Sequence, residues 1–131
     1  MIGILIISHG TLGESLIQCA CHVLNKRPHQ IAQLGVSAQD DPLDILPEAQ
    51  TLVDMVDSGT GVIVLTDIFG ATPSNIAMKL LRPGKVEAVS GANVPMLLRV
   101  LTYREKGDIH SVITKAVAGA CEGVLHHKGG S

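Results

Sequence analysis

The feature that most constrains this chain is a pair of short apolar runs, at residues 2–8 and 62–66, that are almost uninterrupted. Both runs are rich in β-branched residues and leucine, and neither alternates apolar with polar positions. Such runs are typical of strands that are covered on both faces, as in a parallel sheet. They are much shorter than the roughly 20 residues that cross a bilayer, so we expect no direct membrane insertion.

Stretches with helical periodicity separate these strands. Apolar residues recur at steps of three and four over residues 12–24, and Thr11 with Glu14 forms a T-x-x-E capping box at the start. A second helix is expected from Pro42, with Pro47 kinking or dividing it. Thr72 is expected to cap a third helix. The same reasoning predicts further strands at residues 31–36 and 85–90, and further helices at 73–81, 95–103 and 109–120.

Strands and helices therefore alternate along the chain, which is typical of an α/β fold with a parallel sheet. We predict a doubly wound, mainly parallel sheet of strand order 2-1-3-4 with helices on both faces. The chain has 131 residues, a length that suits one domain with one buried core, so residues 1–131 are predicted to form a single domain.

Composition narrows the range of functions. The formal net charge is −2, the basic residues are scattered, and aromatic residues make up 2% of the chain, which argues against nucleic acid as a partner. The first residues lack the pattern of a secretory signal, so we expect a cytoplasmic protein. Cys19, Cys21 and Cys121 match neither a zinc site nor a thioredoxin pair, and we expect reduced, buried thiols with no metal and no cofactor.

The chemistry is expected where the first and third strands end, because ligands of such sheets bind at the carboxyl ends of strands where the winding reverses. His9 follows the first strand and Asp67 follows the third. The Asp67 carboxylate is placed to accept the Nδ1 proton of His9, which leaves the Nε2 lone pair free as a nucleophile. Ser8 should point to the opposite face of its strand, so a serine hydrolase is disfavoured.

Small residues and helix starts surround this pair. One helix begins after His9 and another after Asp67, and free backbone N–H groups at helix N-termini bind phosphate well. The chain has no nucleotide-binding glycine motif, so a bare phosphoryl group fits better than a nucleotide. The sequence thus predicts a histidine phosphorylated on Nε2, and the predicted phosphoryl-binding residues are Gly10, Thr11, Gly70 and Thr72.

Each element of this site also has a structural interpretation. A histidine after a strand is commonly a hydrogen-bonded loop residue, and Asp67 alone could cap a helix. The other histidines lie at helix ends, in loops or in the tail, where solvated or capping roles are expected. A flavodoxin-like cofactor binder is disfavoured, because the chain lacks aromatic residues to cover a flavin ring. Only the joint placement of His9 with its neighbours favours catalysis.

Three segments carry a resemblance to a known family. They are SHG at residues 8–10, TDIFGATPSN at residues 66–75 and VSGANVPML at residues 89–97. The chain resembles the mannose-type enzyme IIA domain of the bacterial phosphoenolpyruvate-dependent sugar phosphotransferase system. The resemblance implies that His9 accepts a phosphoryl group from the phosphocarrier HPr and passes it to a histidine of enzyme IIB, with Asp67 as the orienting carboxylate.

The resemblance also implies a homodimer, in which a short antiparallel strand at about residues 122–127 is exchanged between subunits. A frayed helix end is the alternative for that segment. Because this chain stops at Ser131 with no fused IIB domain, the acceptor is expected to be a separate protein. Two other functions need the same phosphorylated histidine: a regulatory domain that senses phosphorylation without a transport role, and a phosphotransfer subunit of a dihydroxyacetone kinase system.

Overall fold

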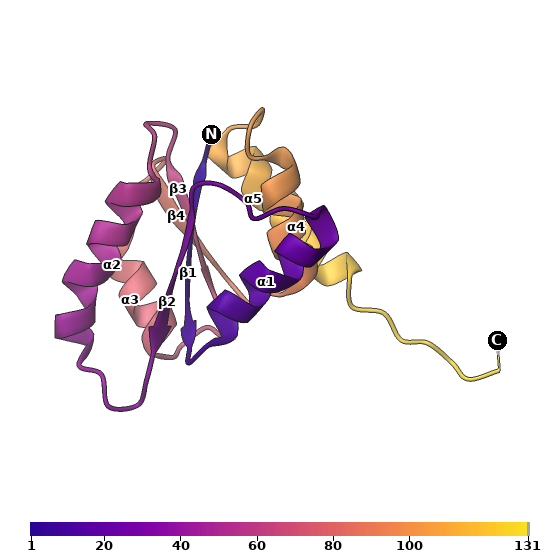
Figure 1. The fold of residues 1–131 in the computed structure, drawn as a ribbon, viewed down its shortest axis with the longest axis horizontal. Coiled ribbons are helices and arrows are strands. Elements are labelled where there is room, and N and C mark those ends of the chain that lie inside the picture. Colours follow the sequence, from indigo (N-terminus) through magenta and orange to yellow (C-terminus); the bar gives the residue numbers. More distant parts are fainter. Residues whose placement is uncertain (131) are drawn as a thin grey trace.

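A computed structural model describes residues 1–130 and contains a four-stranded sheet (Figure 1). The strand order is β2-β1-β3-β4, and all neighbouring strands run parallel. This order places β1 and β3 side by side at the centre, as the two apolar runs predict. The strands are β1 (Gly3–His9), β2 (Ile31–Val36), β3 (Val62–Thr66) and β4 (Val86–Ser90).

Helices cover both faces of the sheet, which confirms the predicted doubly wound α/β architecture. Figure 1 shows one helical layer on each side of the strands. The first layer consists of α1 (Leu12–Leu24), α4 (Val94–Tyr103) and α5 (Ile109–Glu122). The second consists of α2 (Pro42–Val56) and α3 (Thr72–Leu80).

The unbroken apolar run of β1 supplies both halves of the core. Ile4 and Ile6 pack in the cluster beneath α1, α4 and α5, whereas Leu5 and Ile7 pack in the cluster beneath α2 and α3. All four side chains are fully buried. Burying an isoleucine or leucine side chain stabilises a protein by about 1.5–3 kcal/mol, so this strand anchors its own last residue, His9.

Two predicted helix starts differ from the structure. Thr11 is the N-cap of α1 but its side chain makes no capping hydrogen bond, so the predicted capping box is wrong. The buried Ser8 hydroxyl accepts the Gly13 N–H instead, at 2.9 Å, because alternation along β1 turns Ser8 toward this helix. Thr72 is the first residue of α3 rather than its cap, and Ala71 takes the N-cap position in an extended conformation.

Pro47 lies inside α2, which is one continuous helix, so the predicted division is wrong. A proline removes only the hydrogen bond from its own nitrogen to the residue four positions earlier. The apolar contacts of Ala49 and Val53 with the sheet hold the rest of the helix in place.

The predicted burial of the cysteines is also wrong for two of the three, although the three thiols are free. Cys19 and Cys121 are exposed, and Cys21 is half-buried. The buried face of α1 is centred on Leu16, Ile17 and Ala20. Each helical residue is rotated by about 100° from the one before it, and Cys19 falls outside this face.

The C-terminal segment leaves the domain after α5 (Figure 1). Glu122, the first residue of the predicted exchanged strand, is the last residue of α5, and residues 124–128 are exposed and have no regular structure. Strand exchange in a dimer therefore stays a prediction. None of the helices in residues 1–130 combines the length and the apolar character of a membrane span.

Arg104 ties the opposite edge of the sheet together. Its side chain is only 5% exposed, and its guanidinium donates to the carbonyl oxygens of Ile2 at 3.4 Å, Gln30 at 3.3 Å and His29 at 2.5 Å. These carbonyls belong to the chain just before β1 and β2, so one side chain joins the end of α4 to the starts of a central strand and of the edge strand beside it.

Candidate functional site

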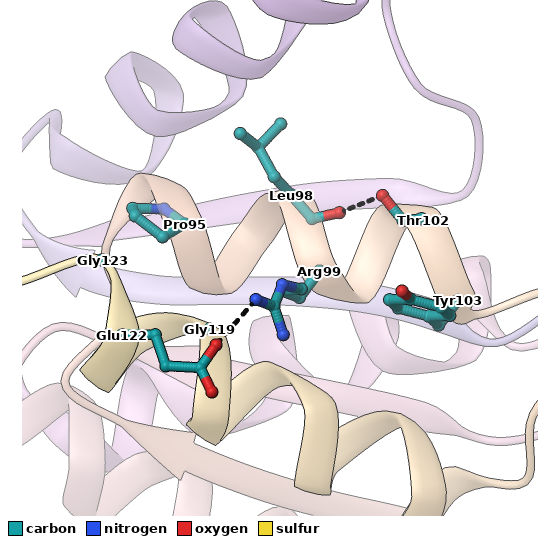
Figure 2. Close-up of a pocket in the computed structure, with 8 residues that line it drawn as sticks. All are labelled: Pro95, Leu98, Arg99, Thr102, Tyr103, Gly119, Glu122 and Gly123. Carbon is teal, nitrogen blue, oxygen red and sulfur yellow. Dashed lines mark hydrogen bonds and ion pairs between the residues drawn. The ribbon is translucent and has the colours of Figure 1, made fainter.

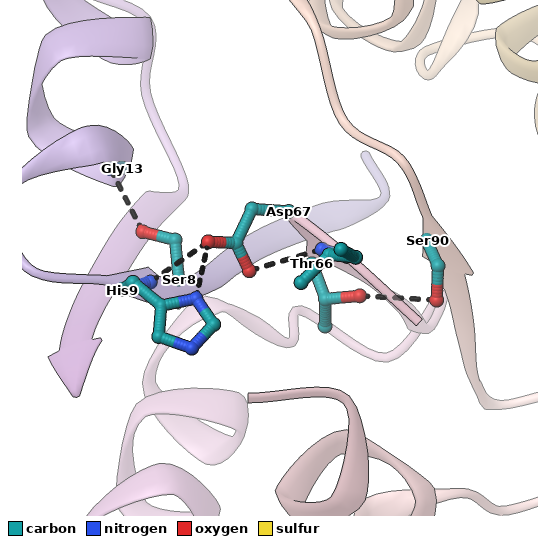
Figure 3. Close-up of polar contacts among 7 residues, drawn as sticks. Ser8, His9, Gly13, Thr66, Asp67 and Ser90 are labelled. Carbon is teal, nitrogen blue, oxygen red and sulfur yellow. Dashed lines mark hydrogen bonds and ion pairs between the residues drawn. The ribbon is translucent and has the colours of Figure 1, made fainter. Parts of the chain in front are cut away.

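The structure brings His9 and Asp67 together at the carboxyl edge of the sheet (Figure 3). β1 and β3 pair in register from Gly3↔Val62 to Ile7↔Thr66, so the residues that follow them project from the same edge. The Nδ1 atom of His9 lies 2.7 Å from Oδ2 of Asp67. The same oxygen also accepts the backbone N–H of His9 at 3.0 Å. The predicted contact between the two side chains is therefore present.

The two side chains differ in exposure. The imidazole of His9 is 54% exposed, whereas the carboxyl of Asp67 is 12% exposed. A partner molecule can thus reach the ring while the carboxylate stays behind it. An ionised carboxylate only accepts hydrogen bonds, so it holds the proton of the neutral ring on Nδ1 and leaves a lone pair on Nε2.

Asp67 is held in its charged form by this geometry. Burial raises the pKa of the Asp67 carboxyl, but the hydrogen bonds from the backbone N–H and the ring of His9 outweigh it and bring the pKa below its ordinary value. The carboxylate is therefore ionised at neutral pH. It can stabilise the positive charge that the ring acquires when Nε2 bonds to an electrophile.

The two helices that follow the pair, α1 and α3, both begin at this edge; α3 begins without a side-chain cap, whereas Ser8 Oγ accepts the Gly13 N–H in the first turn of α1. The N-cap residues of α1 and α3 make no side-chain capping hydrogen bond. The other three helices that the structure describes are each capped by a side chain: Asp41 in α2, Asn93 in α4 and Asp108 in α5. Uncapped N–H groups carry the positive end of the helix dipole, so the edge that holds His9 is favourable for an anion.

The predicted phosphoryl-binding residues all lie along this edge. Gly10 and Thr11 link His9 to α1, and both are exposed. Gly70 and Thr72 lie between Asp67 and the first turn of α3, where Gly70 is exposed and Thr72 is half-buried. Gly10 has φ +56° and Gly70 φ +86°, and a Cβ at either would have no heavy atom within 4 Å. Both loops leave space for a ligand to approach the backbone.

Sequence reasoning missed the hydroxyl groups beneath the site. Thr66 Oγ1 donates to Ser90 Oγ at 3.1 Å and joins β3 to β4 next to Asp67 (Figure 3). Ser8 anchors the start of α1 as described above, directly before His9. In both β1 and β3, a hydroxyl residue directly precedes the candidate site residue: Ser8 before His9 and Thr66 before Asp67. This repetition in the sequence could have pointed to them.

Other surface features do not contribute to this site. A hollow between α4 and α5 is lined by residues such as Arg99 and Tyr103, and an ion pair of 2.9 Å from Arg99 to Glu122 crosses it (Figure 2). It includes neither His9 nor Asp67. His110 is 2.5 Å from Glu87 on the edge strand β4. Within residues 1–130, no cluster of three potential metal-ligating side chains is present.

The chain matches a known protein family over most of its length. The model of the EIIA-man family, described as the PTS system fructose IIA component, matches residues 3–117, which include the whole sheet and both candidate residues. The chain belongs to this family. It is a mannose-family EIIA domain, where PTS denotes the phosphotransferase system. The fold and the pairing of His9 with Asp67 thus occur in a member of the EIIA-man family.

Individual relatives agree with the family. The PTS system mannose-specific EIIAB component of Escherichia coli (strain K12) is 25% identical over 125 residues. The alignment covers 94% of this chain but only 38% of that protein, so the chain spans well under half the length of this relative.

Solved structures of EIIA proteins share the fold. Phosphotransferase system component EIIA from Streptococcus agalactiae has a TM-score of 0.85 and 22% identity, covering 96% of this chain and 97% of that one. The PTS IIA protein associated with the fucose utilization operon from Streptococcus pneumoniae has a TM-score of 0.80 and 26% identity, covering 95% and 91% respectively.

Proposed function

We propose that this EIIA domain is a cytoplasmic phosphoryl carrier that accepts a phosphoryl group from HPr on Nε2 of His9 and passes it to a separate enzyme IIB protein. The observation that carries the proposal is the 2.7 Å contact between Nδ1 of His9 and Oδ2 of Asp67. The carboxylate is mostly buried, whereas the imidazole is about half exposed. The names of its relatives favour this carrier over the regulatory domain and the dihydroxyacetone kinase subunit.

The proposed step is an in-line displacement at phosphorus. The Nε2 lone pair of His9 forms a bond to phosphorus while the bond from phosphorus to the donor histidine nitrogen of HPr breaks. The electron pair of the broken bond returns to that nitrogen. The ring of His9 becomes positively charged with its proton still on Nδ1, and the Asp67 carboxylate stabilises that charge. Transfer to enzyme IIB reverses the same sequence with the acceptor nitrogen as the nucleophile.

The phosphoryl oxygens need a positive environment during both steps. The N–H groups at the start of α3 and the remaining free N–H groups in the first turn of α1 are proposed to supply it, and the exposed loops at Gly10, Thr11, Gly70 and Thr72 leave space for the phosphoryl group to reach them. Positioned N–H donors stabilise developing charge without reorganising.

Intact-protein mass spectrometry tests the proposal. The protein is incubated with phosphoenolpyruvate, enzyme I and HPr, and the expected product carries one acid-labile phosphoryl group. His9→Ala should remain unmodified, whereas His22→Ala, which changes an exposed histidine of α1, should be modified as the wild type is. Addition of enzyme IIB should then remove the group. Phosphorylation of the His9→Ala variant would overturn the assignment.

A further inference from the structure

Gly35 of β2 makes an unusually close approach to the loop that carries His9. In the register of the sheet Gly35 lies opposite Ser8, and Val36 lies opposite His9. A Cβ atom built on Gly35 would lie 2.2 Å from the carbonyl oxygen of Gly10, a distance that real Cβ atoms essentially never show. The atom that it would meet belongs to the backbone, so no side-chain rotation can relieve the contact.

A hydrogen bond fixes the same loop to β2. The backbone N–H of Gly10 donates to the carbonyl oxygen of Val36 at 3.0 Å, and Gly10 adopts φ +56°, which favours glycine. On the other side of the loop, the backbone N–H of His9 donates to Asp67. The peptides before and after His9 are therefore held from opposite sides, by Asp67 and by β2, and Gly35 leaves room for the Gly10 carbonyl that follows.

We propose that Gly35 is a positioning residue for phosphoryl transfer at His9. Because Gly35 has no side chain, the Gly10 carbonyl can pack directly against β2. This packing fixes the backbone next to His9 and so sets the orientation of the imidazole relative to Asp67 and to the partner. The inference rests on the proposed function, because it concerns the geometry of the nucleophile that the function requires.

The distance sets the expected size of the effect. Ordinary van der Waals contacts of a Cβ begin near 3.4 Å, so alanine at position 35 must move the Gly10 carbonyl by more than 1 Å from its present place at 2.2 Å. A misplacement of this order can slow an enzymatic step by about 100-fold. Because the carbonyl lies one residue after His9, we expect the displacement to disturb the backbone that carries the nucleophile.

Gly3 provides a matched control. A Cβ on Gly3 would lie 2.2 Å from the carbonyl oxygen of Val56, the same distance to the same kind of atom, but at the opposite end of β1. Gly35→Ala and Gly3→Ala thus both place a methyl group against a backbone carbonyl, one beside the site and one remote from it. The clash at Gly3 is the more severe, because its Cβ would also lie 2.7 Å and 2.9 Å from two further atoms of Val56. The comparison separates loss of positioning from general destabilisation of the sheet.

The test measures the rate of His9 phosphorylation in both variants, with phospho-HPr and with phosphoramidate as a small donor. Gly35→Ala should be slower by about 100-fold with both donors, because the defect lies in the nucleophile rather than in docking. The ¹⁵N shifts of its imidazole should show a weakened Nδ1–H bond. Gly3→Ala should keep wild-type rates and shifts when folded. Equal rates in the two variants would overturn the inference.

The wild type provides a reading that does not depend on a variant folding. Scalar coupling across the hydrogen bond from Gly10 to Val36, with slow exchange of the Gly10 amide, is expected if the loop is fixed on β2. Absence of the coupling would overturn the inference even if Gly35→Ala cannot be purified. A wild-type protein that takes no phosphoryl group from either donor would overturn the proposed function instead. The coupling between Gly10 and Val36 does not require phosphorylation, so the two failures can be told apart.

Discussion

The exchange Asp67→Asn probes the central contact of the site with little change of shape. The present carboxylate accepts both the ring and the backbone N–H of His9 through one oxygen. Hydrogen bonds to charged groups stabilise proteins by about 1.5–3 kcal/mol, against about 0.5–1.5 kcal/mol for neutral ones. The backbone bond is made equally before and during transfer, so only the ring bond changes as positive charge develops.

The loss of charge at this bond should raise the activation free energy of phosphorylation by about 1–2 kcal/mol. The increase is larger if the amide NH₂ group faces the ring and forces the opposite tautomer. Since about 1.4 kcal/mol is a tenfold change in rate, we expect the loss of charge to slow phosphorylation by about 5- to 30-fold. Rapid-quench measurement of transfer from phospho-HPr, at saturating donor, gives this rate directly.

Asp54→Asn provides the control, because Asp54 is an exposed acid on α2 that is remote in sequence from the site. It should transfer at the wild-type rate. Circular dichroism and thermal unfolding establish that both variants are folded. An Asp67→Asn rate within twofold of the wild type would refute the reasoning, since it would mean that the carboxylate neither orients the ring nor stabilises its charge.

Two further predictions concern stability. The pKa of Asp67 is lower in the folded state than in the unfolded chain, so its contribution is fully present above the unfolded value of about 3.9 and is lost as the pH falls through the lower folded value. Urea unfolding should accordingly give a constant difference between wild type and Asp67→Asn above about pH 5 that shrinks below pH 4; a difference that grows on acidification would contradict this sign. Arg104→Leu should lower the free energy of unfolding by about 3 kcal/mol in the same assay, because buried carbonyl groups lose their donor, and an effect below about 1 kcal/mol would show that water replaces it.

The sequence predicts the contact between His9 and Asp67 because the positions of these two residues depend only on local patterns and on a general rule of topology. The apolar runs locate β1 and β3, and His9 and Asp67 follow them directly. Once the alternation of elements indicates a parallel sheet, the carboxyl ends of neighbouring strands must meet at one edge. No information about distant contacts is needed for this step.

The details that the sequence does not predict depend on distant contacts. The approach of Gly35 to Gly10 joins two strands that are separated by α1, and no pattern along the chain records it. Arg104 finds its acceptors on carbonyl groups more than 70 residues earlier. Capping of α1 by Ser8 rather than Thr11 similarly depends on how the helix packs over the strand. Tertiary packing decides each of these points.

One oxygen of Asp67 restrains the main chain and the ring of the same histidine, and this has a consequence for a carrier. A carrier is loaded by one protein and unloaded by another, and any swing of the imidazole between the two encounters would have to be repeated in every cycle. Because both hydrogen bonds go to the same oxygen atom of Asp67, we expect the ring to keep one orientation throughout the cycle. For the proposed carrier, donor and acceptor are then expected to approach from the same side in turn, so that their binding to the domain is mutually exclusive.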